Sequence, residues 1–103
     1  MKKIKLIIIV CLLTGINGVQ AWAKAKAKVL VFSKTAAFHH KSIAVGVPAI
    51  IKLGQENNFD VDTTTNAEKF TTENLKQYAA VIFLSTTGDV LNDTQQAAFE
   101  QYI

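Results

Sequence analysis

Two adjacent histidines, His39 and His40, are the side chains of this sequence best suited to proton transfer. A neutral imidazole can act as a general base or bind a metal ion near physiological pH. Neighbouring side chains usually diverge, and no further histidine or carboxylate stands at ligand spacing on a shared element, so we expect no metal ion or other cofactor. Two interpretations stay open: one histidine helps to bind a ligand, or both are solvated loop residues with Phe38 packed beneath them.

A polar run, Thr86, Thr87, Gly88 and Asp89, is the second candidate for chemistry. Its hydroxyls, its backbone donors and the Asp89 carboxylate could bind the hydroxyl groups of a ligand, or a phosphate. The same residues also suit an ordinary turn before a helix, because glycine and aspartate are favoured in turns.

Serine side chains are weaker candidates. Ser33 and Ser85 stand at predicted strand ends without the glycine pattern of a nucleophile elbow, so a serine hydrolase is disfavoured. Ser42 could contribute to a site, but it also stands where a helix N-cap is expected.

Three strands are predicted to position these groups. Residues 29–33 and 79–84 are continuous apolar runs, which is typical of parallel strands covered on both faces. Residues 59–64 alternate between apolar and polar side chains, which predicts a strand near an edge of the sheet.

Helices are expected between the strands: from Ser42 to residue 57 or 58, from Thr71 or Thr72 to Gln77, and from Asn92, with Gln95 completing a capping box, to the C-terminus. Pro48 interrupts the first of these, because a proline inside a helix removes one hydrogen bond and clashes with the preceding turn. We therefore expect a kink there, or a start delayed to about Gly46.

The order of elements predicts an α/β fold, the opening of a doubly wound parallel sheet. Ligands of such sheets bind beyond the carboxyl ends of the strands, where the strand order reverses. If the first and third strands are neighbours, residues 34–42 and 85–92 face each other across one crevice. The residues expected to line it are His39, His40, Ser42, Thr86, Thr87, Gly88 and Asp89.

Residues 1–23 have the pattern of a secretory signal peptide. Basic residues precede the apolar run 6–13, and Ala21-Trp22-Ala23 has the small residues that signal peptidase accepts. Eight apolar residues are too few to span a bilayer, so we predict cleavage after Ala23, a secreted or periplasmic protein, and no stable membrane insertion after cleavage. A lipoprotein acylated at Cys11 is the weaker alternative, because a branched valine precedes that cysteine.

Removal of this segment makes the remaining chain formally neutral. Three of the 11 Lys and Arg residues lie within it, which leaves 8 against 8 Asp and Glu. Nucleic-acid binding is therefore disfavoured. The segment also carries the single cysteine, so a thiol nucleophile is not expected in the mature region.

The sequence ends within the last predicted helix, with no further strand to pair beside the third one. A central apolar strand left at an edge is an aggregation hazard. Residues 24–103 are therefore predicted to be the N-terminal part of a larger domain. The alternatives are a prematurely terminated gene or a piece that needs a partner.

Two stretches carry a family resemblance. Residues 29–43, VLVFSKTAAFHHKSI, and residues 78–91, YAAVIFLSTTGDVL, followed by QQAAFE at 95–100, resemble motifs of the ThuA-like (trehalose utilisation) domain. Phe38 and His40 match the family's motif, whereas Ala37 stands where the family often has glycine, so a left-handed turn there would be strained.

The resemblance implies a flavodoxin-like fold of the class I glutamine amidotransferase-like superfamily, three strands and three helices of which would be present. It also implies an exported, carbohydrate-related domain that acts on a sugar or keto-sugar derivative, with His40 as the acid/base and Thr87 and Asp89 orienting hydroxyls. The alternatives are a non-catalytic sugar-binding or interaction domain, and a truncated inactive fragment. The expected partner is a small carbohydrate, and the oligomeric state stays open.

Overall fold

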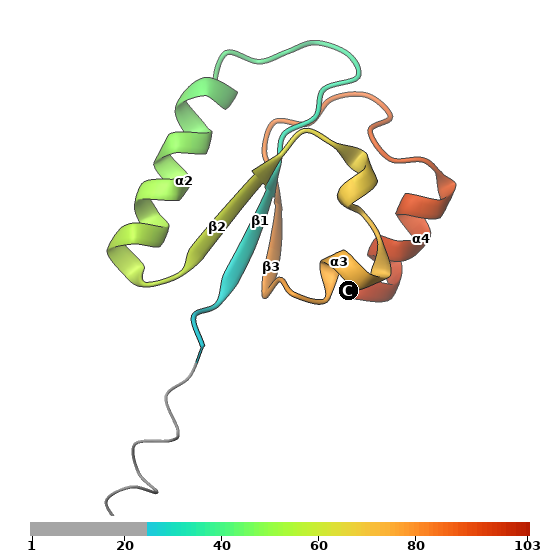
Figure 1. Cartoon of the computed structure of the whole chain (residues 1–103). Coiled ribbons are helices and arrows are strands. Elements are labelled where there is room, and N and C mark those ends of the chain that lie inside the picture. The colour runs from blue at the N-terminus through green and yellow to red at the C-terminus, as the bar shows by residue number, and fades with distance from the viewer. Residues whose placement is uncertain (1–24) are drawn as a thin grey trace, which may run out of the picture.

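The computed structural model describes residues 25–103, in which three strands form one parallel sheet. The strands are β1 (Lys28–Phe32), β2 (Asp60–Thr64) and β3 (Ala80–Phe83), and their spatial order is β2, β1, β3 (Figure 1). The first and third strands are therefore neighbours and the second lies outside the first, which is the condition on which the expected crevice depended. The predicted signal peptide, residues 1–23, lies outside the described part of the chain.

Helices lie on both faces of this sheet (Figure 1). They are α2 (Ile43–Asn57), the 3₁₀ turn η1 (Ala67–Lys69), α3 (Thr72–Leu75) and α4 (Asp93–Tyr102). Helix α2 packs against β2 on one face, whereas α3 and α4 pack together on the other. The predicted α/β architecture, an incomplete flavodoxin-like fold, is confirmed. None of the helices in residues 25–103 is long and apolar enough to cross a membrane.

Strand β1 is central because both of its faces are apolar. Leu30 and Phe32 are buried in the core beneath α3 and α4, and Val31 between them is also fully buried. The Phe32 ring meets the Phe70 ring edge to face, with centroids 4.7 Å apart, and Phe99 of α4 contacts Phe70 in the same way. Removal of this aromatic surface from water is the main force that holds the sheet to α3 and α4.

Helix α2 begins at Ile43 and continues through Pro48, so the expected delayed start is wrong. Burial of Ile43 against the sheet stabilises the first turn, and the proline ring stays exposed on the outer side. Asn58 caps the C-terminus of the helix: its backbone is left-handed (φ 60, ψ 47), and its N–H donates to the carbonyl of Gly54.

The two shorter helices have the caps that the sequence indicates. Asn92 and Gln95 form the predicted capping box of α4. Thr71, the first of the two candidate residues, caps α3 by accepting a hydrogen bond from the Asn74 N–H, and α3 ends at Leu75, two residues earlier than expected.

The two edges of the sheet differ in character. Strand β2 carries Asp60 and Asp62, which pair with lysines, and this edge was predicted from the alternating pattern. Strand β3 was expected to be buried on both faces, but Phe83 is 38% exposed and Ala80 is exposed as well. That expectation is wrong for the described residues, because β3 pairs with β1 on one side and has no strand of residues 25–103 on the other.

Candidate functional site

The loops that leave the carboxyl ends of β1 and β3 are joined to each other directly. Thr35 and Thr87 form an isolated parallel bridge, and the Ala36 N–H donates to the Thr87 carbonyl at 2.8 Å. The Thr87 hydroxyl donates to the Phe38 carbonyl at 2.6 Å. These contacts bring the two loops together as predicted, but they close the gap that the sequence led us to expect between them.

Gly88 is part of this closure. Its φ of 73 lies in the left-handed region, and a Cβ atom at this position would stand 3.1 Å from the Ala36 Cβ and 3.2 Å from the Ala37 nitrogen. Glycine is therefore required for the close approach of the loops. Ala37 is not among the positive-φ residues of the described chain, so the strain anticipated there is absent.

Ser42 does not cap α2 through its side chain, which corrects the expected N-cap. Its backbone φ and ψ are helical, and its hydroxyl lies 3.2 Å from the Ser85 hydroxyl at the end of β3. Ser85 has a φ of 50, which is uncommon for a residue with a side chain. The hydroxyl pair therefore ties the start of α2 to a strained turn.

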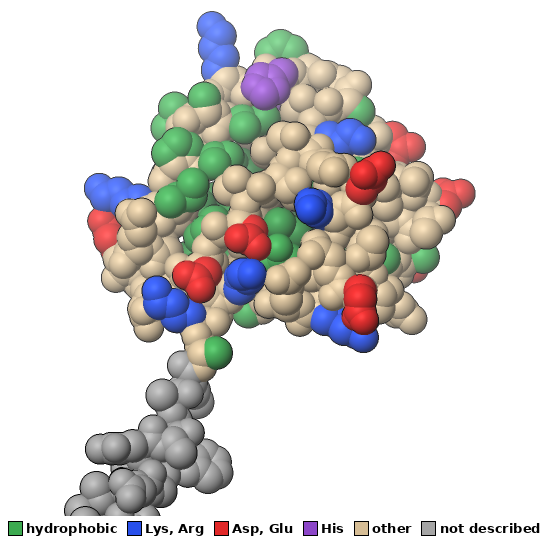
Figure 2. Space-filling view, in the orientation of Figure 1, with side chains coloured by type: hydrophobic (Ala, Val, Ile, Leu, Met, Phe, Trp, Pro, Cys, Tyr) green, Lys and Arg blue, Asp and Glu red, His purple; other side chains and the backbone are tan. Residues whose placement is uncertain are grey.

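Both histidines are exposed on the loop above the sheet, where Figure 2 shows histidine at the top of the molecule. The His39 Nδ1 lies 3.4 Å from the Thr35 hydroxyl, and the His40 ring meets Phe38 edge to face with centroids 4.9 Å apart. Phe38 is 69% exposed, so it does not pack beneath the histidines as expected. The catalytic role of His40 stays a prediction.

A pocket of about 450 Å³ opens on the α4 side of the same sheet edge. We call it the carboxyl-edge pocket. It lies between the loop after β1, the turn after β2 and the start of α4. It is lined by Lys34, Thr65, Asn66, Ala67, Glu68, Asp89, Val90, Leu91, Asn92 and Gln95. Of the seven predicted site residues, Asp89 alone lines it.

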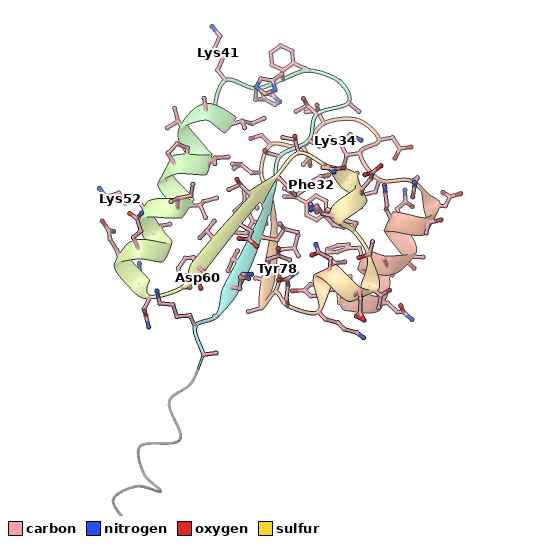
Figure 3. All side chains as sticks on the ribbon, in the orientation of Figure 1. Phe32, Lys34, Lys41, Lys52, Asp60 and Tyr78 are labelled. Atoms are coloured by element: carbon pink, nitrogen blue, oxygen red, sulfur yellow. The ribbon has the colours of Figure 1, made fainter. Side chains whose placement is uncertain are left out.

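The charged side chains of the carboxyl-edge pocket are not neutralised locally. Within residues 25–103, neither Lys34 nor the carboxylates of Glu68 and Asp89 make an ion pair or a side-chain hydrogen bond. Figure 3 shows Lys34 above the end of β1, close to η1, whereas Lys41 extends away from the fold. These three ionisable groups are therefore available to a ligand.

The uncharged side chains of the pocket are held by helix caps. The Asn66 Oδ1 accepts from the Glu68 N–H at 3.0 Å, and the Asn92 Oδ1 accepts from the Gln95 N–H at 2.8 Å. The Gln95 Oε1 accepts from the Asn92 N–H at 2.9 Å. The oxygen of each amide is thus occupied, and the NH₂ group is the part of each amide left to bind a ligand.

A second polar cluster lies on β2, outside the carboxyl-edge pocket. The Tyr78 hydroxyl donates to the Asp62 Oδ2 at 2.7 Å, and the Lys28 Nζ stands 3.5 Å from the same oxygen. Burial, with the hydrogen bond and the charge of Asp62, raises the pKa of Tyr78 from 10.0 to about 12. These partners satisfy one another, so we assign the cluster a structural role.

Sequence reasoning missed the turn after β2. Thr65, Asn66 and Glu68 follow that strand directly, so the rule that places ligands beyond carboxyl ends could have selected them. Lys34 was inside the predicted loop but was not singled out. No cluster of three or more histidine, cysteine, aspartate or glutamate side chains in residues 25–103 is arranged to hold a metal ion.

Comparison with known proteins gives two matches and one negative result. The family model ThuA, described as trehalose utilisation, matches residues 28–103. The crystal structure of a ThuA-like protein from Bacteroides uniformis ATCC 8492, at 2.30 Å resolution, is 32% identical with a TM-score of 0.63. The match covers 80% of this chain and 34% of that chain, so this chain spans about a third of its neighbour's length. No curated protein matches.

The family match begins at the first residue of β1 and includes the whole sheet, both histidines and every residue of the carboxyl-edge pocket. The match to the crystallised ThuA-like protein covers 80% of the chain at an identity above 30%. The chain therefore belongs to the ThuA (trehalose utilisation) family.

Proposed function

We propose that this ThuA domain binds a sugar or keto-sugar derivative in the carboxyl-edge pocket. The observation that carries the proposal is that Lys34, Glu68 and Asp89 line one pocket beyond the strand ends without pairing to other groups of residues 25–103. Lys34 is half-buried, and Glu68 and Asp89 are exposed at the mouth of the pocket. Unpaired groups of both signs around one cavity are free to bind a ligand that both donates and accepts hydrogen bonds.

The chemistry of the lining suits a molecule with many hydroxyl groups. Each hydroxyl can donate to a carboxylate and accept from an ammonium or amide group at the same time. The pocket offers both kinds of partner side by side, and its volume of about 450 Å³ is within the usual range for small-molecule sites. The family description, trehalose utilisation, is consistent with a sugar ligand.

Binding is favoured over catalysis for the part of the protein described here. His40, the predicted acid/base, does not line the carboxyl-edge pocket and contacts Phe38 at the surface. A catalytic His40 would need a ligand that reaches beyond the pocket to the histidine loop. We also propose that the domain is exported, on the basis of the pattern of residues 1–23. A mature N-terminus at Lys24, measured by intact mass after secretion, would support export, and retention of Met1 in cells would contradict it.

Trehalose is the probe for the proposed site. Saturation-transfer NMR on the full chain should detect the binding of trehalose. Lys34→Gln should weaken this signal, because the substitution removes an ammonium donor from the pocket. Lys41→Gln is the matched control, because Lys41 carries the same charge on the same loop but points away from the fold. Equal loss in both variants, or no trehalose binding by the full chain, would contradict the proposal.

A further inference from the structure

We infer that the carboxyl-edge pocket selects an uncharged sugar and rejects the same sugar carrying a phosphate group. This inference rests on the proposed function and names the ligand class of that same pocket. It follows from the charge balance of the lining, the orientation of the three amides and the state of the α4 N-terminus.

The charge balance of the pocket is negative. Lys34 contributes one positive charge, and Glu68 and Asp89 contribute one negative charge each, while the other lining residues are uncharged. A phosphate group would meet two carboxylates and one ammonium, and the juxtaposition of like charges in a binding site is unfavourable. An uncharged sugar meets no such repulsion.

The two carboxylates also select for hydrogen-bond donors. An ionised carboxylate accepts hydrogen bonds only, so Glu68 and Asp89 need ligand O–H or N–H groups. The hydroxyls of a sugar supply them, whereas the oxygens of a phosphate dianion cannot. A phosphate placed beside either carboxylate would leave both groups without a donor.

The N-terminus of α4 borders the pocket and would be expected to attract an anion. Here two N–H groups of that terminus are already bound, because the Asn92 and Gln95 side chains accept the N–H groups of Gln95 and Asn92 within the capping box. The first helical residue, Asp93, adds a further negative charge. The free NH₂ groups of the pocket amides are uncharged donors, so they can bind the hydroxyl oxygens of a sugar and need no phosphate group as acceptor.

The inference is tested by titrating the full chain with trehalose and with trehalose 6-phosphate at one pH and one ionic strength. We expect the dissociation constant of the phosphorylated sugar to be higher by about tenfold or more. In the double variant Glu68→Gln, Asp89→Asn the preference should shrink or reverse, because the shape is kept and the repulsion is removed. Glu100→Gln, an exposed change on α4 outside the pocket, should leave the preference unchanged.

The outcomes distinguish sugar binding by the pocket from discrimination against a phosphate group. Binding of trehalose with equal or tighter binding of trehalose 6-phosphate would overturn the inference and leave the proposed function standing. A preference for trehalose that persists undiminished in the double variant would overturn the role given to Glu68 and Asp89. Failure of both sugars to bind the unaltered chain would overturn the proposed function and, with it, the inference.

Discussion

Replacement of Tyr78 by phenylalanine should destabilise the fold at neutral pH and have little or no cost at alkaline pH. The Tyr78 side chain is buried, and its hydroxyl donates to the Asp62 carboxylate at 2.7 Å. Hydrogen bonds to charged groups contribute roughly 1.5–3 kcal/mol. Because the Asp62 side chain is 45% exposed, we expect a value at or below the lower end of that range, about 1 to 1.5 kcal/mol. Tyr78→Phe should therefore lower the free energy of unfolding by about that amount at pH 8.

The alkaline behaviour follows from the pKa of Tyr78, which burial and the bond to Asp62 raise to about 12. A raised folded-state pKa stabilises the fold fully below the unfolded value of 10.0, and this stability is lost as the pH rises towards 12. At pH 11 the loss is about 1.4 kcal/mol, one pH unit above the unfolded pKa. Because phenylalanine does not titrate, the variant and the unaltered protein should have nearly equal stability there.

Urea unfolding followed by far-ultraviolet circular dichroism measures the free energy of unfolding of both proteins at pH 8 and at pH 11. A double-mutant cycle with Asp62→Asn is the control. Tyr78→Phe should lower the free energy of unfolding by less in the Asp62→Asn background, because the charged acceptor of the hydrogen bond is gone. A stability difference between Tyr78→Phe and the unaltered protein that stays the same at both pH values would refute this account of Tyr78.

Three further substitutions test individual contacts. Thr87→Val removes the hydrogen bond to the Phe38 carbonyl and should cost about 1 kcal/mol while speeding hydrogen exchange in the histidine loop. Gly54→Ala should cost about 1 to 3 kcal/mol in urea unfolding, because the new Cβ would lie 2.6 Å from the Phe59 carbonyl oxygen. Thr71→Val removes the side-chain cap of α3 and should lower the melting temperature through a loss of about 1 kcal/mol.

Each of these substitutions has a matched control, which lies in the same loop for Thr87, in the same helix for Gly54 and in another helix for Thr71. Thr86→Val changes a neighbouring hydroxyl that makes no side-chain hydrogen bond within residues 25–103. Amide hydrogen exchange in the histidine loop should therefore stay as slow in this variant as in the unaltered protein. Gly46→Ala meets the mobile end of the Leu84 side chain and should cost much less than Gly54→Ala. Thr94→Val lies in the first turn of α4 without a capping bond. A control that loses as much as its test variant would contradict the corresponding contact.

Local patterns in the sequence were sufficient for most of the fold. The apolar run of β1 predicted a central strand because both faces of a parallel strand are covered in this architecture. Asn92 with Gln95 predicted the start of α4, since capping involves side chains only three residues apart. The order of elements then predicted one parallel sheet, in which the first and third strands lie side by side as the expected crevice required.

The site was harder to predict because it depends on contacts between distant residues. The Thr87 hydroxyl and the Phe38 carbonyl are 49 positions apart, and their bond closes the crevice that each loop alone suggested. For the same reason the hydroxyl of Ser42 contacts Ser85 instead of capping its own helix. Lys34 became a candidate only when the fold placed it beside Glu68 and Asp89.

Amide chemical shifts measured during a trehalose titration test the central claim most directly. If the carboxyl-edge pocket is the sugar site, the largest changes should fall on Lys34, Glu68 and Asp89, with His39 and His40 little affected. Saturating changes centred on His39 and His40, with none at the carboxyl-edge pocket, would contradict the account.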